Sequence, residues 1–466
     1  MEKNTLKKVL SRFDVLFLAI GAMLGWGWVV LSGNWILSAG SMGSLIAFAI
    51  GGILVIFVGL TYSELASSMP EVGGEHAYVL RAMGEKASFI ASWAIILGYV
   101  SVVTFEAVAL PTVIDYLISD YQSVYLWTIA GWDVYLTWVL IGVIGAFLLT
   151  MVNYFGLKPA ALVQSVLTVT IVMIGLVLIF GASIGGDPSN LTPFFVGGAG
   201  GIMAVLIMVP FLFVGFDVIP QVAEEANLPP KEIGKVLILS VSCAVVFYLA
   251  IAFGVGIAMN QSVLKASELA TADAMAVVFG SKKFATALIL GGVAGIITSW
   301  NAFIIGGSRV IYAMAKSGML PEWFGYLHPK YKTPSNAIVA LGGLAVLAPL
   351  LGRPALVWIV DAGGLGIVTA YFMVALSFLI LRKREPGMER PFRAGKSNFI
   401  GWIALFLSIG FISLYMPGMP AALIWPYEWL MVLGWFLIGA FFFLRMNKVK
   451  YPDIQKTDSS DIKVNS

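Results

Sequence analysis

Long apolar runs, separated by short polar segments, set the organisation of this chain. A helix needs about 20 apolar residues to cross the hydrocarbon core of a membrane, and the runs approach or exceed that length. The pattern predicts an all-α polytopic membrane protein with about twelve transmembrane helices. The predicted spans lie near 14–38, 41–66, 88–118, 134–153, 158–181, 200–222, 236–259, 284–315, 336–351, 354–381, 399–416 and 424–444.

The basic residues indicate which side of the membrane each polar segment faces. An even number of spans returns both termini to the same side. Because cytoplasmic loops carry an excess of Lys and Arg, we expect both termini in the cytoplasm and the protein in the cell membrane. Of the 28 Lys and Arg residues, only four lie in segments assigned to the opposite side, namely Lys265, Lys282, Lys283 and Arg353.

Composition narrows the function further. The chain is 59% apolar and 11% charged, against roughly 25% charged residues in a soluble domain. Its single cysteine, Cys243, excludes an internal disulfide and a cysteine-based metal site. We find no Walker-type phosphate loop, no clustered metal ligands and no nucleophile–base pair. We therefore expect the protein to be neither an enzyme nor an ATP-driven pump, and we expect it to hold no metal or cofactor. The expected partners are the bilayer and a small solute, not nucleic acid.

The first span holds three glycines near its middle, Gly21, Gly25 and Gly27. Glycine inside a helix costs about 0.5–1 kcal/mol relative to alanine, so their presence needs a reason. One interpretation is close helix packing through small residues. The other is a break in the helix, whose freed backbone groups bind a solute at mid-membrane depth.

The sixth span is predicted to be interrupted as well. A break is expected at 214–217, a stretch that contains Gly215 and lies between Pro210 and Pro220. Proline removes a helical hydrogen bond, and glycine loosens the backbone. Two broken helices five spans apart are what a 5+5 inverted repeat produces. The predicted organisation is a cytoplasmic N-terminus at 1–13, five-helix repeats at 14–181 and 200–381, two extra helices at 399–444 and a cytoplasmic tail at 445–466.

Four motifs carry a resemblance that covers nearly the whole chain. They are the glycines of the first span, the segment at 62–74 after the second span, Phe213 to Asp217 followed by residues 224–227, and the segment at 309–321 that leaves the eighth span. In this order they resemble the amino acid, polyamine and organocation permeases, which have the leucine-transporter fold. The resemblance implies secondary transport by alternating access, as symporter or exchanger.

The resemblance also implies where the substrate lies, between spans 1, 3, 6, 8 and 10. The backbone at 23–27 would receive a carboxylate and the carbonyls at 213–216 an amine, in keeping with the charges of helix ends. We expect the substrate-binding residues to be Met23, Gly25, Trp26, Gly27, Glu106, Phe213, Gly215, Phe216 and Asp217.

Two features depart from the family pattern. Trp26 and Trp28 flank Gly27, and their indoles either line the pocket, where a π face can cover a cation, or pack against neighbouring helices. Glu106 lies near the middle of the third span, where a carboxyl group costs about 2.5–3.5 kcal/mol on insertion scales. It is interpreted as a ligand for a substrate amine, as a proton carrier or as a structural group.

The coupling ion is left open between Na⁺, H⁺ and none. Some proton-coupled relatives carry a lysine in the fifth span, where this chain has Thr168 or Thr170. A sodium site is expected at Ala22, Thr298 and Ser299, unless these hydroxyls bond only to their own helix.

Three further acidic or basic residues receive an interpretation. His76 is expected in a cytoplasmic loop as sequence variation, and Asp217 is expected to cap or orient the broken sixth span. Asp361 either faces an outer vestibule or ends a helix near Arg353. Outside the membrane, 262–270 is expected to form a short helix.

We expect an amino acid substrate. A carboxylate-free organic amine or polyamine is the alternative, encouraged by Glu106 and the tryptophans. A solute sensor and a channel-like relative are the alternatives from other classes.

Overall fold

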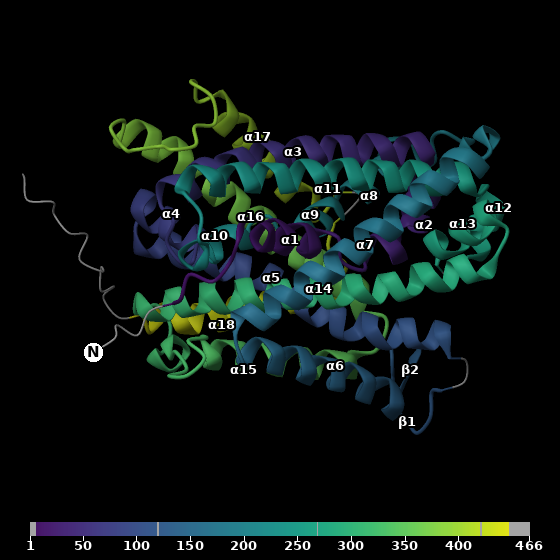
Figure 1. Cartoon of the computed structure of the whole chain (residues 1–466), viewed down its shortest axis with the longest axis horizontal. Coiled ribbons are helices and arrows are strands. Elements are labelled where there is room, and N and C mark those ends of the chain that lie inside the picture. The colour runs from purple at the N-terminus through teal and green to yellow at the C-terminus, as the bar shows by residue number, and fades with distance from the viewer. Residues whose placement is uncertain (1–5, 119–120, 268, 420–421, 447–466) are drawn as a thin grey trace, which may run out of the picture.

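The computed structural model describes residues 6–446 except 119–120, 268 and 420–421. The described part is a bundle of helices with one small hairpin (Figure 1). The predicted tail at 445–466 lies outside the described residues except for its first two. The first half of the chain forms α1 (Arg12–Met23), α2 (Gly27–Ala39), α3 (Ser41–Ser68), α4 (Glu75–Met83), α5 (Glu85–Leu117), β1 (Tyr125–Ile129), β2 (Trp132–Tyr135), α6 (Leu136–Tyr154), α7 (Leu157–Gly185), α8 (Gly198–Leu206), α9 (Val209–Phe213) and α10 (Val218–Gln221).

The second half continues as helices. They are α11 (Pro230–Ala258), α12 (Gln261–Ala266), α13 (Ala270–Phe279), α14 (Lys282–Lys316), α15 (Ser335–Leu347), α16 (Ala355–Arg384), α17 (Phe399–Leu414) and α18 (Tyr427–Leu444), with 3-10 turns η1 (Pro188–Leu191), η2 (Ala223–Glu225), η3 (Glu322–Gly325) and η4 (Ala348–Leu351).

The helices of the structure agree with the membrane spans predicted from the sequence. Within the described residues, nine helical segments are long and apolar enough to cross a membrane, and α1 with α2 forms a tenth span bent by 41°. Two shorter apolar segments, Ser335–Leu351 and Phe399–Leu414, occupy the remaining predicted spans. The all-α polytopic class is confirmed, and the chain is a multi-pass membrane protein.

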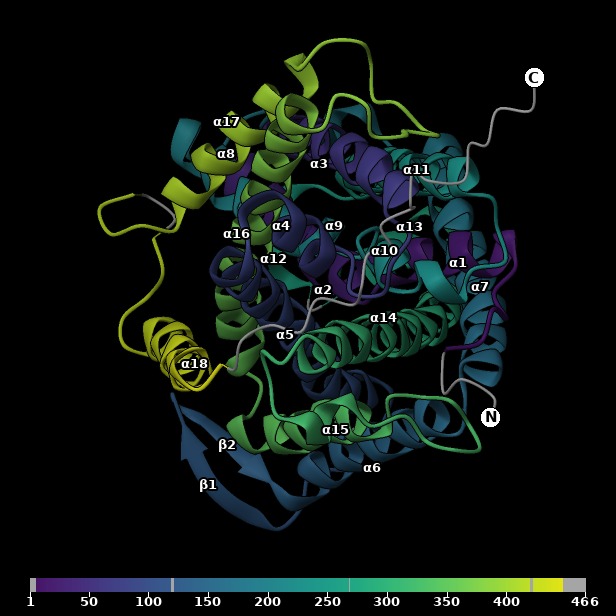
Figure 2. The same cartoon turned by 90° about the vertical axis from the view of Figure 1, so that its left-hand side faces the viewer.

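The long helices surround the two broken spans. Seen along the bundle, α9 and α10 lie inside a ring that includes α3, α5, α11 and α14, whereas α17 and α18 lie at its edge (Figure 2). Helices α5 and α14 are buried along most of their length, and α18 is largely exposed. The two broken spans therefore occupy the centre of the protein. The division into two five-helix repeats stays a prediction.

Three elements outside the spans were not predicted. The segment after α5 forms an antiparallel hairpin of β1 and β2, and α4 and α13 are helices where loops were expected. The expected short helix at 262–270 is α12, which ends four residues earlier. The hairpin, α12 and α13 lie at one end of the bundle and α4 at the other (Figure 1).

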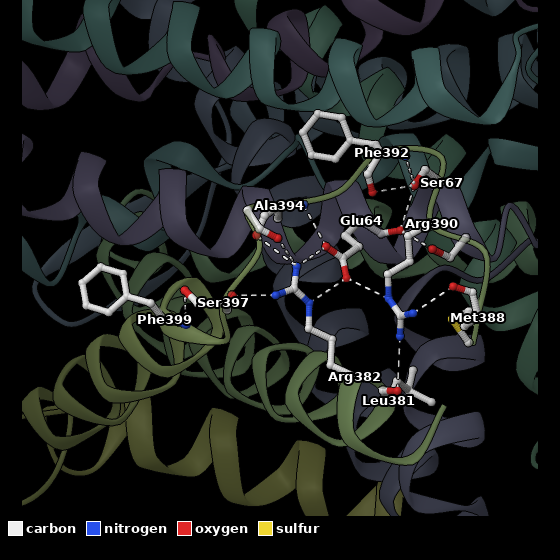
Figure 3. Close-up of polar contacts among 12 residues, drawn as sticks. Glu64, Ser67, Leu381, Arg382, Met388, Arg390, Phe392, Ala394, Ser397 and Phe399 are labelled. Carbon is white, nitrogen blue, oxygen red and sulfur yellow. Dashed lines mark hydrogen bonds and ion pairs between the residues drawn. The ribbon is translucent and has the colours of Figure 1, made fainter. Parts of the chain in front are cut away.

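A buried ionic cluster joins α3 to the end of α16 (Figure 3). The Glu64 carboxylate accepts hydrogen bonds from Arg382 Nε at 2.8 Å and from the backbone N–H of Ala394 at 2.8 Å, and Arg390 Nε lies 3.0 Å from it. The cluster gives a physical role to the motif at 62–74: its carboxylate anchors the segment that follows α16.

Candidate substrate site between two broken helices

The first span breaks where its glycines predict. Helix α1 ends at Met23, α2 begins at Gly27, and the two are inclined by 41°. A Cβ on Gly25 would lie 2.8 Å from Glu106 Oε1 and from Ser299 Cβ, too close for any larger residue. A Cβ on Gly21 would instead meet the Thr168 hydroxyl. Gly21 allows close packing and Gly25 lies in the break, while binding of a solute by the freed backbone groups stays a prediction.

The sixth span breaks at the predicted residues. Val214 is extended and Gly215 has φ +138°, a conformation that suits glycine alone. The Asp217 carboxylate accepts a hydrogen bond from the Gly215 N–H at 2.7 Å and another from the Tyr99 hydroxyl. Asp217 thus orients the break, as the sequence indicates.

The two breaks face each other. A Cβ on Gly215 would lie 2.7 Å from Ala22 Cβ and 2.9 Å from the Met23 backbone nitrogen. Glycine at position 215 therefore allows the two interrupted backbones to approach. Neither break lies at the lipid surface, where an unpaired backbone group would be costly.

A small cavity of about 20 Å³ lies beside the first break, room for about one or two water molecules. An amino acid is larger, so binding needs the surrounding helices to move apart. The lining is formed by Ala22, Met23, Gly25, Gly27, Val102, Phe105, Glu106, Phe211, Leu212, Tyr248, Ser299 and Phe303.

Glu106 is the ionisable residue in the lining of this cavity. It is buried, and its carboxyl group lies beside the Ser299 hydroxyl and the Trp26 backbone N–H. Its Oε2 atom is buried and has no hydrogen-bond partner among the described residues. An acceptor left without a donor inside a protein costs free energy, so this oxygen is available to a donor on a ligand.

Several predicted site residues lie outside the lining. Trp26 packs against α14 at Gly292, and Trp28 packs edge-to-face on Phe247 with ring centroids 5.4 Å apart. The structure thus favours the packing interpretation of both indoles. Phe213 contacts Tyr248, and Phe216 contacts Tyr62 and Tyr371. Gly215 and Asp217 do not line the cavity, and they set the backbone conformation at the break of the sixth span.

Only two of the three residues expected to hold sodium line the cavity. Ala22 and Ser299 line the cavity, but the Thr298 hydroxyl donates to the carbonyl of Gly295 in its own helix at 3.0 Å. Of the two threonines expected near the position of the absent lysine, Thr168 donates to the Phe17 carbonyl at 3.1 Å, and Thr170 donates to the Val166 carbonyl in its own helix. A neutral hydroxyl therefore contacts α1 there.

Tyr248 is a lining residue that the sequence did not indicate. Its hydroxyl, carried by α11, donates to the Met23 carbonyl at the end of α1 at 2.8 Å. Nothing in the apolar run around it distinguishes this tyrosine from a core residue, because the contact joins segments 225 residues apart.

A second, larger cavity shares a lining residue with this one. Phe105 borders both, and its ring lies 5.3 Å from that of Phe211. The larger cavity, which we call the outer vestibule, has a volume of about 340 Å³. Asp361 and Arg353 both line it, so Asp361 faces a vestibule rather than only ending a helix.

A buried ion pair lies beyond the break of the sixth span, at η2. Arg309 of α14 donates from Nε and Nη2 to the Glu225 carboxylate at 2.9 and 3.1 Å. The N-terminal segment adds to this contact, because the Val9 and Leu10 N–H groups donate to the Glu225 carbonyl at 2.9 and 3.0 Å. We call this set of contacts the inner closure.

His76 is not in a loop. It lies on α4, buried, with Nε2 2.7 Å from the Ser317 hydroxyl and Nδ1 3.0 Å from that of Ser88. Burial lowers the pKa of His76 to about 4. The expectation of a loop was wrong because the residues that bury this imidazole come from α5 and the end of α14.

Two facing helix breaks with a small cavity beside them, inside a multi-pass bundle, are typical of a membrane transporter. A family model described as amino acid permease matches residues 10–444, and the chain belongs to that family.

Similar proteins cover most of the chain. The branched-chain amino acid permease BcaP of Bacillus subtilis (strain 168) is 28% identical over 430 residues, which are 88% of this chain and 90% of that protein. The serine/threonine exchanger SteT of the same organism is 26% identical, over 87% of this chain and 90% of its own length. A methylthioribose transporter, also from this organism, is 25% identical over 94% of this chain and 93% of its own length.

Proposed function

We propose that this protein carries an amino acid across the cell membrane by alternating access, as a symporter or exchanger, with both termini in the cytoplasm. The observation that carries the proposal is the cavity at the first break, where backbone groups and one buried carboxyl group converge. Family membership supports it, as do relatives named for branched-chain amino acids and for serine and threonine.

The two ends of a zwitterion match the two kinds of group at this cavity. The start of α2 at Gly27 presents backbone N–H groups, which favour a carboxylate. Glu106 presents a carboxyl oxygen without a partner, which suits an ammonium group. Substrate would thus lie between the first break and α5.

Alternating access follows from the contacts on either side of the cavity. Separating Phe105 from Phe211 would open it to the outer vestibule, and releasing Arg309 from Glu225 would open it to the cytoplasm. Binding energy can shift such an equilibrium only if the substrate contacts differ between the two states.

A ligand panel tests the substrate class. A ligand that binds only the folded protein stabilises it by RT ln(1 + [L]/Kd), about 2.7 kcal/mol at a hundredfold excess over Kd. We expect amino acids to raise the melting temperature of the purified protein and their decarboxylated amines not to. Stabilisation by amines alone would overturn the amino acid assignment and point to the organic-amine alternative.

The coupling ion needs a flux measurement. Two sites suit a cation: the Glu106 carboxyl group for H⁺, and Ala22 with Ser299 for Na⁺, since oxygen atoms are the ligands of hard cations. Uptake into proteoliposomes under a sodium gradient, a proton gradient or neither separates these cases. Counterflow with no ion gradient would identify a carrier that needs no coupling ion, and it would exclude a sensor and a channel.

A further inference from the structure

Two carboxyl groups meet at the ends of α16 and α18 that lie beside the outer vestibule. The helices are held together there by Trp358 and Tyr427, whose rings stack with centroids 4.2 Å apart. Asp361 follows Trp358 by one helical turn and Glu428 follows Tyr427 directly, and the two carboxyl groups are in hydrogen-bond contact.

Glu428 is fully buried, and only one of its oxygens has a donor. Oε2 accepts a hydrogen bond from the Ile424 backbone N–H at 2.6 Å. Oε1 is buried and has no hydrogen-bond partner among the described residues, and the Asp361 carboxyl group lies beside that of Glu428. Two ionised carboxylates are both acceptors, so the contact is a hydrogen bond only if one of them carries a proton.

Among the residues that the structure describes, the neighbours offer no other donor or counter-charge. Tyr415, which follows α17, lies near Asp361, but its hydroxyl donates to the Ile207 carbonyl at 2.9 Å. Arg353 lines the same cavity, yet the ion pairs found among the described residues include neither carboxyl group. A proton is the cation that fits between oxygens already in hydrogen-bond contact.

We propose that Asp361 and Glu428 form a proton-binding site that exchanges with the outer vestibule and holds α18 against α16. The proton enters and leaves through Asp361, because Asp361 lines the vestibule whereas Glu428 is buried. Loss of the proton leaves two facing carboxylates, which repel. The assignment of the vestibule to the outer side rests on the proposed function, whereas the proton-binding site does not depend on transport.

Thermal unfolding as a function of pH tests the site without any transport assay. The unfolded chain releases carboxyl protons above about pH 4, whereas the native pair keeps one. The native state then binds more protons, so stability falls as pH rises. In E428Q the amide donates to Asp361 without a titrating proton. We expect the wild-type melting temperature to fall by roughly 2–4 °C more than that of E428Q between about pH 6 and about pH 9.

Controls make the outcome decisive. Other buried carboxyl groups, including Glu75 on α4, whose pKa burial raises, titrate equally in both proteins and cancel in the comparison. D133N, an exposed aspartate of the hairpin, should keep the wild-type profile, and D361N should behave like E428Q. Parallel wild-type and E428Q profiles would overturn the proposal. A wild-type profile that changes with added Ca²⁺ or a chelator would overturn it in favour of a metal ion.

Discussion

Glu106 shows how one residue in an apolar span acquires a role from its surroundings. Its span is otherwise a buried helix, and the insertion cost of a carboxyl group there argues for a function. The structure adds that Oε2 has no partner among the described residues and that Gly25 leaves space for the carboxyl group. The sequence alone identifies the carboxyl group, but it does not show that one of its oxygens lacks a hydrogen-bond partner.

We predict that Glu106→Gln weakens amino acid binding roughly 10- to 100-fold, because it removes a hydrogen bond to a charged group worth about 1.5–3 kcal/mol. Titration of the ligand-induced melting shift measures the affinity. Glu322→Gln, which changes an exposed glutamate on η3, serves as the control and should bind normally. Unchanged affinity together with an unchanged pH dependence of uptake would remove both functional roles from Glu106.

His76 makes the protein acid-sensitive. Its pKa is lowered to about 4 by burial, against about 6.5 in an unfolded chain. Between these values the unfolded state binds more protons, so stability is present above about pH 6.5 and is lost as pH falls, by about 3 kcal/mol in all.

We predict that His76→Gln flattens the fall of the melting temperature between about pH 6.5 and about pH 4. The amide still donates and accepts hydrogen bonds toward Ser317 and Ser88. His328→Gln, outside this cluster, should keep the wild-type acid profile. An equally steep fall in His76→Gln would show that another group is responsible.

At the scale of elements, the breaks were predictable and their surroundings were not. Gly25, Gly215 and Pro210 disturb helices locally, and such signals can be read from a single chain. The orientation of Trp26 and the contact of Tyr248 with Met23 depend on helices far away in the sequence. The hairpin and α4 were missed because the strong periodic signal of the spans does not extend to short surface elements.

The Glu64 cluster yields a prediction at this scale. Glu64→Gln leaves Arg382 and Arg390 buried without their carboxylate, and breaking a buried ion pair costs about 3–5 kcal/mol. Thermal or denaturant unfolding measures the loss. The matched control is Glu385→Gln, because its partner Arg81 is exposed and such pairs contribute about 0.2–1 kcal/mol. Equal losses in the two variants would contradict the role given to the cluster.

For the whole molecule, the two barriers on either side of the cavity differ in chemistry. The outer one is a contact between two aromatic rings, and the inner closure combines a buried ion pair with backbone hydrogen bonds. Apolar contacts lack the directional constraints of ion pairs. The outer barrier is therefore the one that a single truncation should open.

A labelling experiment checks this. In a Cys243→Ser background, Ser299→Cys places the only thiol of the chain at the cavity. We expect a membrane-impermeant thiol reagent to label it from outside slowly, and markedly faster once Phe211→Ala is added. Phe194→Ala, which removes an exposed ring from an outer loop, should not accelerate labelling. Equal rates would show that Phe211 is not the barrier.

The inner closure also bears on how the protein can be handled. Besides the two hydrogen bonds from Val9 and Leu10, the Asn227 N–H donates to the Leu10 carbonyl at 2.8 Å, so this short stretch pairs like a strand with the chain behind the sixth span. An affinity tag fused close to it, or trimming by a protease past Leu10, would perturb the inner closure itself. Fusions and fluorescent labels should therefore be placed away from this stretch.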